Sequence, residues 1–334
     1  MAPKKRNVAV VGATGAVGRE MVAVLAQRRF PVADLRLLAS ERSVGQRLEF
    51  GDAEIAVDVL GPASFAGVEI ALFSAGGSVS KEYAPIAASA GAVVVDNTSA
   101  FRMEPDVPLV VPEVNPQALA GWRGRRIIAN PNCSTIQMVV ALKPIHDAVR
   151  IRRIVVSTYQ AVSGAGQRGI DELERQVRDL FNLREVKREL FPHRIAFNLI
   201  PCIPQSNAFG EADTTVEEWK MINETHKILD PSIAVAATCV RVPVFSGHAE
   251  AVYLDLERPL AAEQARDLLR RAPGVAVLDD PAKMLFPTPL DATGEDLTLV
   301  GRIRGDPSNP NGLWLFVVAD NLRKGAALNA VQIA

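Results

Sequence analysis

Cysteine and histidine are both scarce in this 334-residue sequence, and their scarcity narrows the chemistry open to it. The three cysteines, Cys133, Cys202 and Cys239, are odd in number and widely spaced, which argues against a disulfide framework and indicates a reducing cytosol. No group of cysteines and histidines has the spacing of a zinc site, so we expect no metal. The sequence also contains no internal repeat and no low-complexity segment.

A large net charge and a long apolar run are missing as well. The 37 lysines and arginines nearly balance the 38 aspartates and glutamates. The sequence therefore lacks the excess of positive charge that would indicate binding to nucleic acid or to an anionic membrane. Residues 1–6 (MAPKKR) are basic, but no apolar segment follows them as in a signal peptide, and no later run is long enough to span a bilayer. We therefore expect a cytoplasmic globular protein that binds neither nucleic acid nor membrane.

What the sequence does contain is an alternation of strand and helix signals in its first part. Short apolar runs at residues 7–11, 35–39, 69–73, 92–95 and 109–111 predict strands, and residues 19–28 predict a helix. Strands that alternate with helices are typical of an α/β domain with a Rossmann-like, doubly wound parallel sheet. The chain is long enough for a second domain with its own core.

The second part predicts a different, α+β architecture. Longer strands are expected at residues 151–160, 195–203, 235–244 and 249–256, which suit an antiparallel or mixed sheet, with helices at 170–181 and 214–229. We place the first domain at residues 1–128 and the second at 129–312. Residues 313–334, read as a strand and then a helix, are expected to return to the first domain.

A glycine-rich turn follows the first predicted strand. Its glycines, Gly12, Gly15 and Gly18, have the spacing GxxGxxG rather than the commoner GxGxxG. Glycines permit a tight turn and a close approach of the backbone, and the start of the following helix would face a pyrophosphate. A glycine-rich turn without a ligand is the alternative, but the strand–turn–helix context favours a dinucleotide.

The end of the second predicted strand bears on which dinucleotide binds. Sites that prefer NAD place an acid there to hold the ribose 2′-hydroxyl. Here Arg42, with Ser40 and Ser43, suits a 2′-phosphate instead, which favours NADP. Glu41 is a counter-signal, since a shift of one residue in register would make it that acid.

Cys133 lies in the motif NPNCST at residues 130–135, between a predicted strand end at 126–129 and a predicted apolar helix at 136–145. The unpaired N–H groups and the dipole at a helix start favour an anion. A thiol in this position ionises more readily and becomes a nucleophile, and the same N–H groups can hold an oxyanion. A buried, inert cysteine is the competing interpretation.

A cysteine nucleophile in a dinucleotide-binding protein also needs a proton-transfer group and anchors for the substrate. His248, after a Ser-Gly turn, is the best acid/base candidate of the four histidines, although a lone histidine there is usually structural. Arg241 can grip a carboxylate with its planar guanidinium group. Arg102 follows a predicted strand at the sheet edge where ligands bind, and is a second anion anchor or a surface arginine.

Three further polar residues admit two interpretations each. Glu217 and Lys220 are three residues apart on a predicted helix, so they can meet an amine and a phosphate or form an ordinary surface ion pair. From the residues alone, the surface ion pair is the preferred interpretation. Gln160 ends a predicted strand, where its amide can orient a substrate or cap the turn. Spacing alone does not decide between these roles.

Six motifs in order nevertheless resemble one enzyme family. They are GATGAVG at 12–18, SAFR at 99–102, NPNCST at 130–135, YQAVSGAG at 159–166, EEWK at 217–220 and RVPVFSGH at 241–248. Together they resemble bacterial aspartate-β-semialdehyde dehydrogenases over essentially the whole chain, ending with the segment at 319–334. No functional position departs from the family's pattern. The family is usually dimeric through its second domain and supplies precursors of lysine, threonine, methionine and diaminopimelate.

The resemblance implies a mechanism and a role for each motif residue. Cys133 would attack the β-carbonyl of L-aspartyl phosphate, and NADPH would reduce the resulting thioester to L-aspartate 4-semialdehyde, with His248 as acid/base partner. Gln160 would position the acyl group, Arg241 would hold the α-carboxylate, and Glu217 would lie near the amino group. Phosphate would be bound by Arg102, Lys220 and Asn132. The residues implied to line NADP are Thr14, Gly15, Ala16, Val17, Arg42, Ser43, Ser163, Gly164 and Asn321, in addition to Gly12 and Ser40.

Three other functions compete with this one. A sister reductase acting on another acyl phosphate, such as N-acetylglutamyl phosphate, would share the fold and the cysteine, but the EEWK and RVPVFSGH motifs suit a free amino acid. An inactive dinucleotide-binding relative would be expected to have lost Cys133, His248 or Arg241. A glyceraldehyde-phosphate-type dehydrogenase is disfavoured because the second predicted strand lacks an obvious acid at its end.

Overall fold

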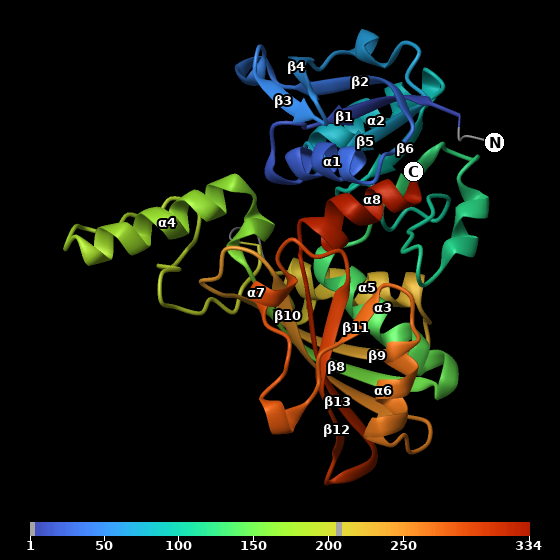
Figure 1. Ribbon diagram of the computed structural model, residues 1–334, viewed down its shortest axis with the longest axis vertical. Helices are drawn as coiled ribbons and strands as arrows, with labels where there is room; N and C mark the ends of the chain where they lie inside the picture. The colour runs from blue at the N-terminus through green and yellow to red at the C-terminus, as the bar shows by residue number, and fades with distance from the viewer. Residues whose placement is uncertain (1–3, 205–208) are drawn as a thin grey trace. The chain divides into compact units, whose positions relative to one another are not determined.

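The computed structural model describes residues 4–204 and 209–334 (Figure 1). The chain divides into two compact units. The first consists of Met1–Asn132 together with Ala326–Ala334, and the second of Cys133–Gly325. Within the described ranges, none of the helices combines the length and the apolar character needed to cross a bilayer.

The first unit is built on a seven-stranded sheet in the order β3-β4-β2-β1-β5-β6-β7. β1 pairs in parallel with β2 and β5, and only the edge hairpin β3–β4 is antiparallel. The predicted Rossmann-like fold is therefore confirmed. The strands are β1 (Arg6–Val11), β2 (Val32–Ala39), β3 (Arg47–Phe50), β4 (Ala53–Val59), β5 (Ile70–Phe73), β6 (Val93–Asp96) and β7 (Ile127–Ala129); the helices are α1 (Ala16–Gln27), α2 (Gly77–Ser89) and α8 (Leu328–Ile333).

Apolar side chains of β1, α1 and α8 form the core of this unit. Val10 of β1, Leu25 of α1 and Leu328 of α8 are buried in one cluster, and α8 lies beside α1 (Figure 1). The buried amide of Asn329 donates to the Val110 carbonyl at 3.0 Å and to Asn130 Oδ1 at 2.7 Å. The end of the chain is thus joined to Asn130, the first residue of the cysteine motif.

The strand predicted at residues 109–111 does not form. Leu109 makes only an isolated bridge to Ala129, because Pro108 and Pro112 flank the segment and the Val114 N–H turns back to the Val111 carbonyl. The β3–β4 hairpin, in contrast, was not predicted from the sequence. Its strands are short and mostly exposed, and charged residues interrupt their apolar ones.

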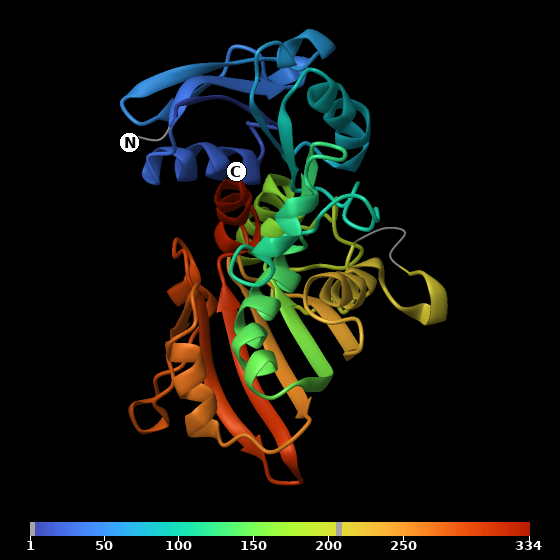
Figure 2. The same ribbon diagram turned by 90° about the vertical axis from the view of Figure 1, so that its right-hand side faces the viewer.

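The second unit contains a mixed six-stranded sheet in the order β11-β12-β13-β10-β8-β9, which confirms the predicted α+β architecture. β10 is antiparallel to both β8 and β13, whereas β8 and β9 are parallel. α3 lies against one face of this sheet (Figure 2). The strands are β8 (Ile151–Gln160), β9 (Ala234–Arg241), β10 (His248–Leu256), β11 (Val275–Val277), β12 (Thr298–Asp306) and β13 (Asn309–Ala319); the helices are α3 (Cys133–Ala148), α4 (Gln167–Phe181), α5 (Val216–Ile228), α6 (Ala262–Arg270) and α7 (Pro289–Ala292).

Two sequence predictions about this unit need correction. Residues 195–203 form no strand, because Pro201 cannot donate to a ladder and Phe197 has a left-handed backbone, which leaves only a bridge between Ile200 and Arg241. The strand predicted at 313–318 lies within β13, between β10 and β12 of the second sheet, and does not return to the first domain. The returning segment is therefore shorter than predicted and begins at Ala326.

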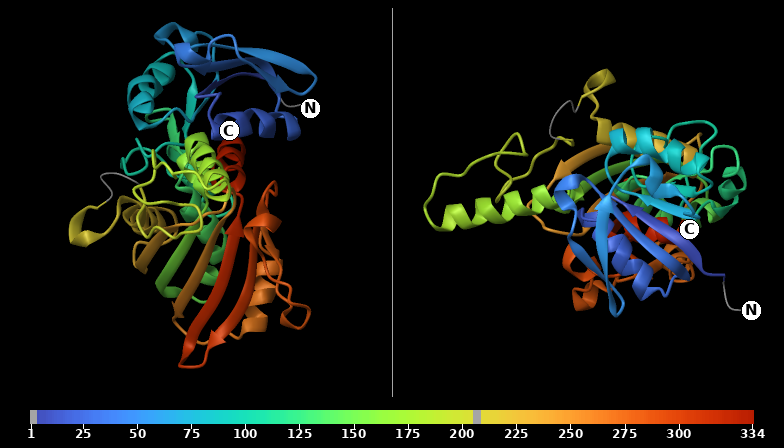
Figure 3. Two further views of the ribbon diagram at one scale, coloured as in Figure 1. Left: turned by 90° about the vertical axis from the view of Figure 1, so that its left-hand side faces the viewer. Right: turned by 90° about the horizontal axis from the view of Figure 1, so that it is seen from above.

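α4 extends away from the six-stranded sheet of its own unit (Figure 3). Its base is held by Glu172 and Gln176, which are buried and bind the backbone N–H groups of Leu190 and Ile195. Beyond this base the end of α4 leaves large apolar side chains exposed.

Candidate active site

Strand register in the second unit brings three of the predicted site residues together, at the same end of three neighbouring strands. Gln160 and Arg241 end the parallel strands β8 and β9 and are paired with each other. His248 begins β10, whose next residue, Ala249, pairs with Tyr159 of β8. All three side chains are buried. Residues up to 88 positions apart in the sequence (248 − 160 = 88) thus form one polar row.

Cys133 is the first residue of α3, which therefore begins three residues before the helix predicted at 136–145 and includes the residue expected in the preceding turn. Its side chain is partly exposed, whereas Cys239 is buried and burial raises the pKa of that thiol strongly. A Cβ atom on Gly325 would lie 2.9 Å from the Cβ of Cys133, so only glycine fits over the cysteine without displacement. Gly325 was not predicted as a site residue, because its only local signal in the sequence is a glycine within a predicted helix.

The ring of His248 has a defined orientation and a low proton affinity. Its Nδ1 accepts a hydrogen bond from the N–H of Ala161 at 3.0 Å, so the neutral ring carries its proton on Nε2. Burial, assisted by the charge of Arg241 and opposed by Glu217, lowers the pKa of His248 to about 3. Nε2 has no hydrogen-bond partner among the described residues. It is therefore the ring atom available to a ligand.

Arg241 and Gly164 are packed against this histidine. One guanidinium nitrogen, Nη1 of Arg241, donates to the Ala161 carbonyl at 2.6 Å, and burial lowers the pKa of the arginine. A Cβ on Gly164 would lie 2.8 Å from that nitrogen and 3.1 Å from Nε2 of His248. Glycine at position 164 therefore leaves the space above both groups open.

Glu217 and Lys220 do not form an ordinary surface pair. Glu217 is buried at the start of α5, where Thr215 and Glu218 cap the helix reciprocally. Its carboxylate accepts from Gln160 Nε2 at 3.0 Å and from Lys220 Nζ at 2.9 Å. Gln160 is thus tied to a carboxylate on a helix and does not merely cap its turn. The pair is anchored to the polar row, which spacing alone did not reveal.

Arg102 and Asn132 belong to the first unit and are both buried. Arg102 donates through Nε to the Asn130 carbonyl and through Nη2 to the Asn97 carbonyl, both at 2.9 Å. Arg102 is therefore a buried residue held against the backbone of the cysteine motif. Asn132 directly precedes Cys133 in the chain.

The predicted dinucleotide turn has the geometry that a phosphate-binding loop requires. Gly12 has φ +84°, and a Cβ on it would lie 2.7 Å from the Ser74 carbonyl oxygen. A Cβ on Gly18 would lie 2.1 Å from the Gly12 carbonyl oxygen. Gly15 is the N-cap of α1 and offers no side chain to its N–H groups. These backbone donors suit a pyrophosphate.

The remaining cofactor candidates lie beside this turn or in the second unit. Ser40 caps a short helical turn, Glu41–Ser43, in which Arg42 is exposed, and Ser43 Oγ lies 3.1 Å from Thr14 Oγ1. Ala16 and Val17 begin α1. In the second unit Asn321 Nδ2 donates to Ser163 Oγ at 2.9 Å, and its Oδ1 accepts from the Gly247 N–H. The serine–asparagine contact joins two motifs that are far apart in the sequence.

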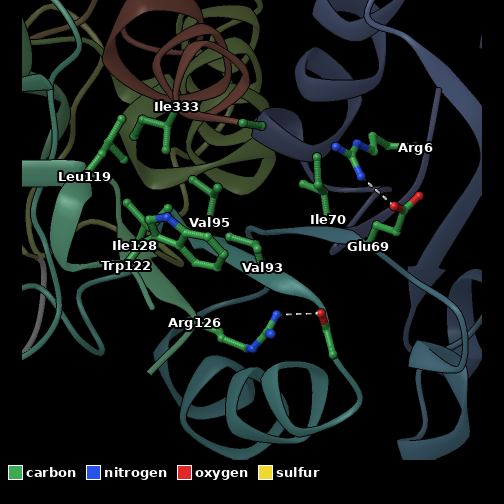
Figure 4. A pocket seen from close by; sticks show the side chains of 12 residues that line it. Arg6, Glu69, Ile70, Val93, Val95, Leu119, Trp122, Arg126, Ile128 and Ile333 are labelled. Atoms are coloured by element: carbon green, nitrogen blue, oxygen red, sulfur yellow. Dashed lines mark hydrogen bonds and ion pairs between the residues drawn. The ribbon is translucent and has the colours of Figure 1, made fainter. Parts of the chain in front are cut away.

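The first unit also contains a cavity of about 470 Å³ (Figure 4), and no residue of the turn lines it. It is lined by Arg6, Ile70 and Val93 at the starts of β1, β5 and β6, whereas Gly12 follows the end of β1. Arg6 is engaged by Glu69, and Arg126 by the Gly91 carbonyl. Within residues 4–204 and 209–334, no cluster of three or more His, Cys, Asp or Glu side chains could hold a metal ion.

Comparison with known proteins identifies relatives of the whole chain. Residues 7–122 match the family model "Semialdehyde dehydrogenase, NAD binding domain", and residues 142–324 match "Semialdehyde dehydrogenase, dimerisation domain". The chain is 57% identical over 330 residues to an aspartate-semialdehyde dehydrogenase of Legionella pneumophila, which covers 98% of this chain and 94% of that protein.

Solved structures show the same fold. Aspartate semialdehyde dehydrogenase II from Vibrio cholerae, solved as a complex with ASA, has a TM-score of 0.96 and 55% identity, over 99% of this chain and 97% of that one. The Candida albicans enzyme, described as aspartate semialdehyde dehydrogenase with NADP, has a TM-score of 0.75 and 27% identity over the same shares of the two chains.

Proposed function

The chain belongs to the semialdehyde dehydrogenase family, and from this premise we propose that it is an NADP-dependent aspartate-semialdehyde dehydrogenase. It reduces L-aspartyl 4-phosphate to L-aspartate 4-semialdehyde with release of phosphate, a reversible step toward lysine, diaminopimelate, threonine and methionine. The observation that carries this proposal is the row of Gln160, Arg241 and His248, with its carboxylate neighbour Glu217, in a chain that matches such enzymes over 98% of its length.

The reaction begins at the sulfur of Cys133. Its attack on the acyl carbonyl forms a carbon–sulfur bond, phosphate leaves, and a thioester remains on the cysteine. NADPH, when bound, supplies the hydride for the reduction of this thioester. The thiohemiacetal on Cys133 then breaks its carbon–sulfur bond, which releases the aldehyde and regenerates the thiol. We assign the acid/base role to Nε2 of His248, because Nδ1 is occupied by the N–H of Ala161.

Different polar and charged side chains bind different groups of the substrate. Arg241 binds the α-carboxylate, since its guanidinium is desolvated and needs an anion. Glu217 binds the amino group, and Gln160, held by Glu217, positions the acyl group. Phosphate binding is assigned to Arg102, Asn132 and Lys220. For Arg102, the support is that the carbonyls of Asn97 and Asn130 fix its guanidinium.

The first unit supplies most of the groups proposed to bind NADP. Gly12, Thr14, Gly15, Ala16 and Val17 present backbone donors to the pyrophosphate at the start of α1. Arg42, with Ser40 and Ser43, binds the 2′-phosphate, and its exposure suits an anionic ligand that arrives from solvent. Ser163, Gly164 and Asn321 are also assigned to NADP, and the serine and the asparagine are hydrogen-bonded to each other.

We further propose that the protein is a cytoplasmic homodimer that uses neither nucleic acid nor membrane. The match of residues 142–324 to a dimerisation domain supports the dimer. So does a group of exposed apolar side chains around the end of α4, where Phe181, Leu183 and Phe197 are 77%, 96% and 63% exposed. A cluster of this kind is typical of a surface that another chain covers.

The proposal is tested by a phosphate-dependent assay of the purified protein with L-aspartate semialdehyde, in which NADP and NAD are compared through the absorbance of the reduced cofactor. We expect reduction of NADP that requires phosphate and is faster than reduction of NAD. If NADP is reduced with N-acetylglutamate semialdehyde but not with aspartate semialdehyde, the protein is a sister reductase and the proposed substrate is wrong. A folded, reduced protein that turns over neither substrate would contradict the assignment of an active enzyme.

A further inference from the structure

A buried carboxyl group that the proposed mechanism does not use lies next to the catalytic row. Glu250 is two residues after His248 on β10, so both side chains point to the same face of the sheet. Both are fully buried. The neighbours of Glu250 across the sheet are Thr158 of β8 and Val317 of β13, and neither is a cation. A buried charged carboxylate without a cationic partner would be strongly destabilising.

The side chain that faces Glu250 from the helix layer is Gln137 of α3. Contact with the Gln137 amide opposes in part the effect of burial, which raises the pKa of Glu250 well above its ordinary value. Gln137 Nε2 donates to the carbonyl oxygen of His248 at 3.3 Å. Gln137 is also four residues after Cys133 on the same helix, one turn away on the same face. The amide therefore connects the helix that carries the cysteine with the strand that carries the histidine.

Gln137 and Glu250 both contain buried polar atoms that lack a hydrogen-bond partner among the described residues. Among residues 4–204 and 209–334, no donor binds the buried acceptor Gln137 Oε1, and neither oxygen of Glu250 has a hydrogen-bond partner. A carboxylic acid in its neutral form is a donor, and the neutral form is the one that this apolar environment favours. One hydrogen bond from the Glu250 hydroxyl to Gln137 Oε1 would satisfy a buried group on each side. It would also leave the Gln137 Nε2 donor directed at His248.

We propose that Glu250 and Gln137 are positioning residues: the Glu250 hydroxyl orients the Gln137 amide, which fixes the start of β10 at His248 against α3 at Cys133. This inference concerns the residues of the second unit alone, and its effect on turnover rests on the proposed function. The linkage acts through the backbone of His248 and touches no substrate. Its loss therefore lowers kcat and leaves KM nearly unchanged.

The decisive experiment compares Glu250→Gln with Glu250→Met in the full-length protein. Glutamine keeps a neutral donor of the same length, so we expect kcat within about threefold of the parent. Methionine keeps the volume but has no donor, and we expect kcat to fall about 10- to 100-fold, the usual effect of losing a group that orients a catalytic ligand or base. Gln137→Met should lower kcat by a similar factor, with KM within about twofold in each case.

A matched control is Val252→Ala, which removes buried volume two residues further along the same face of β10. It should lower the melting temperature while leaving kcat unchanged, because it does not touch the hydrogen-bonded link. If Val252→Ala lowers kcat as much as Glu250→Met does, or if Glu250→Gln is as impaired as Glu250→Met, the positioning role is wrong and Glu250 acts only in packing.

Two measurements that need no turnover separate this inference from the proposed function. The rate of alkylation of Cys133 by iodoacetamide should change in Glu250→Met and Gln137→Met and stay at the parental value in Glu250→Gln. The effects of Glu250→Met and Gln137→Met on the free energy of unfolding should be non-additive, since both remove the same link. Additive effects would contradict the link even if the enzyme proves fully active. An inactive parent with non-additive effects would contradict only the proposed function.

Discussion

The dinucleotide turn of the first unit and the polar row of the second are built in opposite ways. The turn is made of contiguous residues, Gly12 to Gly18, and its important feature is backbone that no side chain obstructs. The row consists of buried side chains from separate strands, Gln160, Arg241 and His248, and the charge of Arg241 helps burial to lower the pKa of His248. A backbone site should fail when a single Cβ is added, whereas a side-chain site should fail when a charge or proton is removed.

The largest effect on turnover is expected from substitution of Cys133, the proposed nucleophile. Cys133→Ser replaces the thiol by a far weaker nucleophile, so turnover should fall at least about 1,000-fold. NADP binding, which depends on the other region, should be unchanged when measured by fluorescence titration. Appreciable retained turnover would remove Cys133 as the nucleophile.

His248→Asn tests whether the polar row acts by transferring a proton. Because the ring is buried with only Nε2 available, we expect kcat to fall about 100- to 10,000-fold while KM changes little. Steady-state kinetics with both substrates varied give the two constants. If KM rises and kcat is kept, His248 is a binding group and not the acid/base partner.

The same variant should also change how the free energy of unfolding depends on pH. His248 is neutral when folded, with its pKa lowered by burial to about 3 from 6.5, so the unfolded chain binds the extra proton between these values. The contribution of His248 to stability is thus complete above pH 6.5 and is lost as pH falls toward 3, by about 1.4 kcal/mol for each pH unit. Urea unfolding from pH 7 to pH 4 should show His248→Asn losing less stability than the parent. Parallel curves would contradict the buried neutral ring.

Gly12→Ala is the matching test of the backbone region. The new Cβ would lie 2.7 Å from the Ser74 carbonyl oxygen at a residue with φ +84°, so we expect a loss of about 1–3 kcal/mol in the free energy of unfolding. NADP affinity should fall with it, while alkylation of Cys133 keeps its rate. Gly51→Ala is the control, since its φ is also positive but no atom lies within 4 Å of its added Cβ. Equal loss of NADP affinity in both variants would show that strain alone is responsible.

The smallest effect is expected from Arg42→Ala, which leaves the turn intact and removes one exposed cation. NADP affinity should fall about tenfold, the value of one charge-assisted hydrogen bond to phosphate, and NAD affinity should stay the same. Isothermal titration with both cofactors measures the ratio. Equal weakening of NAD and NADP would move the 2′-phosphate site elsewhere.

The two regions also differ in how far the sequence predicts them. The turn is visible in the sequence because its glycine spacing and its flanking strand and helix are local. The position of Cys133 near the start of a helix is predicted for the same reason, although α3 begins three residues earlier than the predicted helix. The partnership of Glu217 with Gln160 is not predicted, because it depends on how α5 packs against β9, the strand next to β8, and the residues alone favoured a surface ion pair. Gly164 was assigned to the cofactor, and its fit against Arg241 and His248 emerges only in three dimensions.

The errors in the fold have a similar origin. Residues 195–203 are as apolar as a strand, but Pro201 and the left-handed Phe197 prevent a regular ladder. Residues 313–318 form the predicted strand, yet which sheet they join depends on pairing with β10, about 60 residues earlier. Short-range patterns therefore predicted the type of an element more reliably than its partner.

The most direct test of the account is a single-turnover experiment with L-aspartate semialdehyde and NADP in the absence of phosphate. We predict a burst of about one equivalent of NADPH per active chain, because the acyl group remains on the enzyme until an acceptor arrives. Peptide mass spectrometry should then find an aspartyl thioester on Cys133 that disappears when phosphate is added. A burst without acylation of Cys133, or acylation of another residue, would contradict the account.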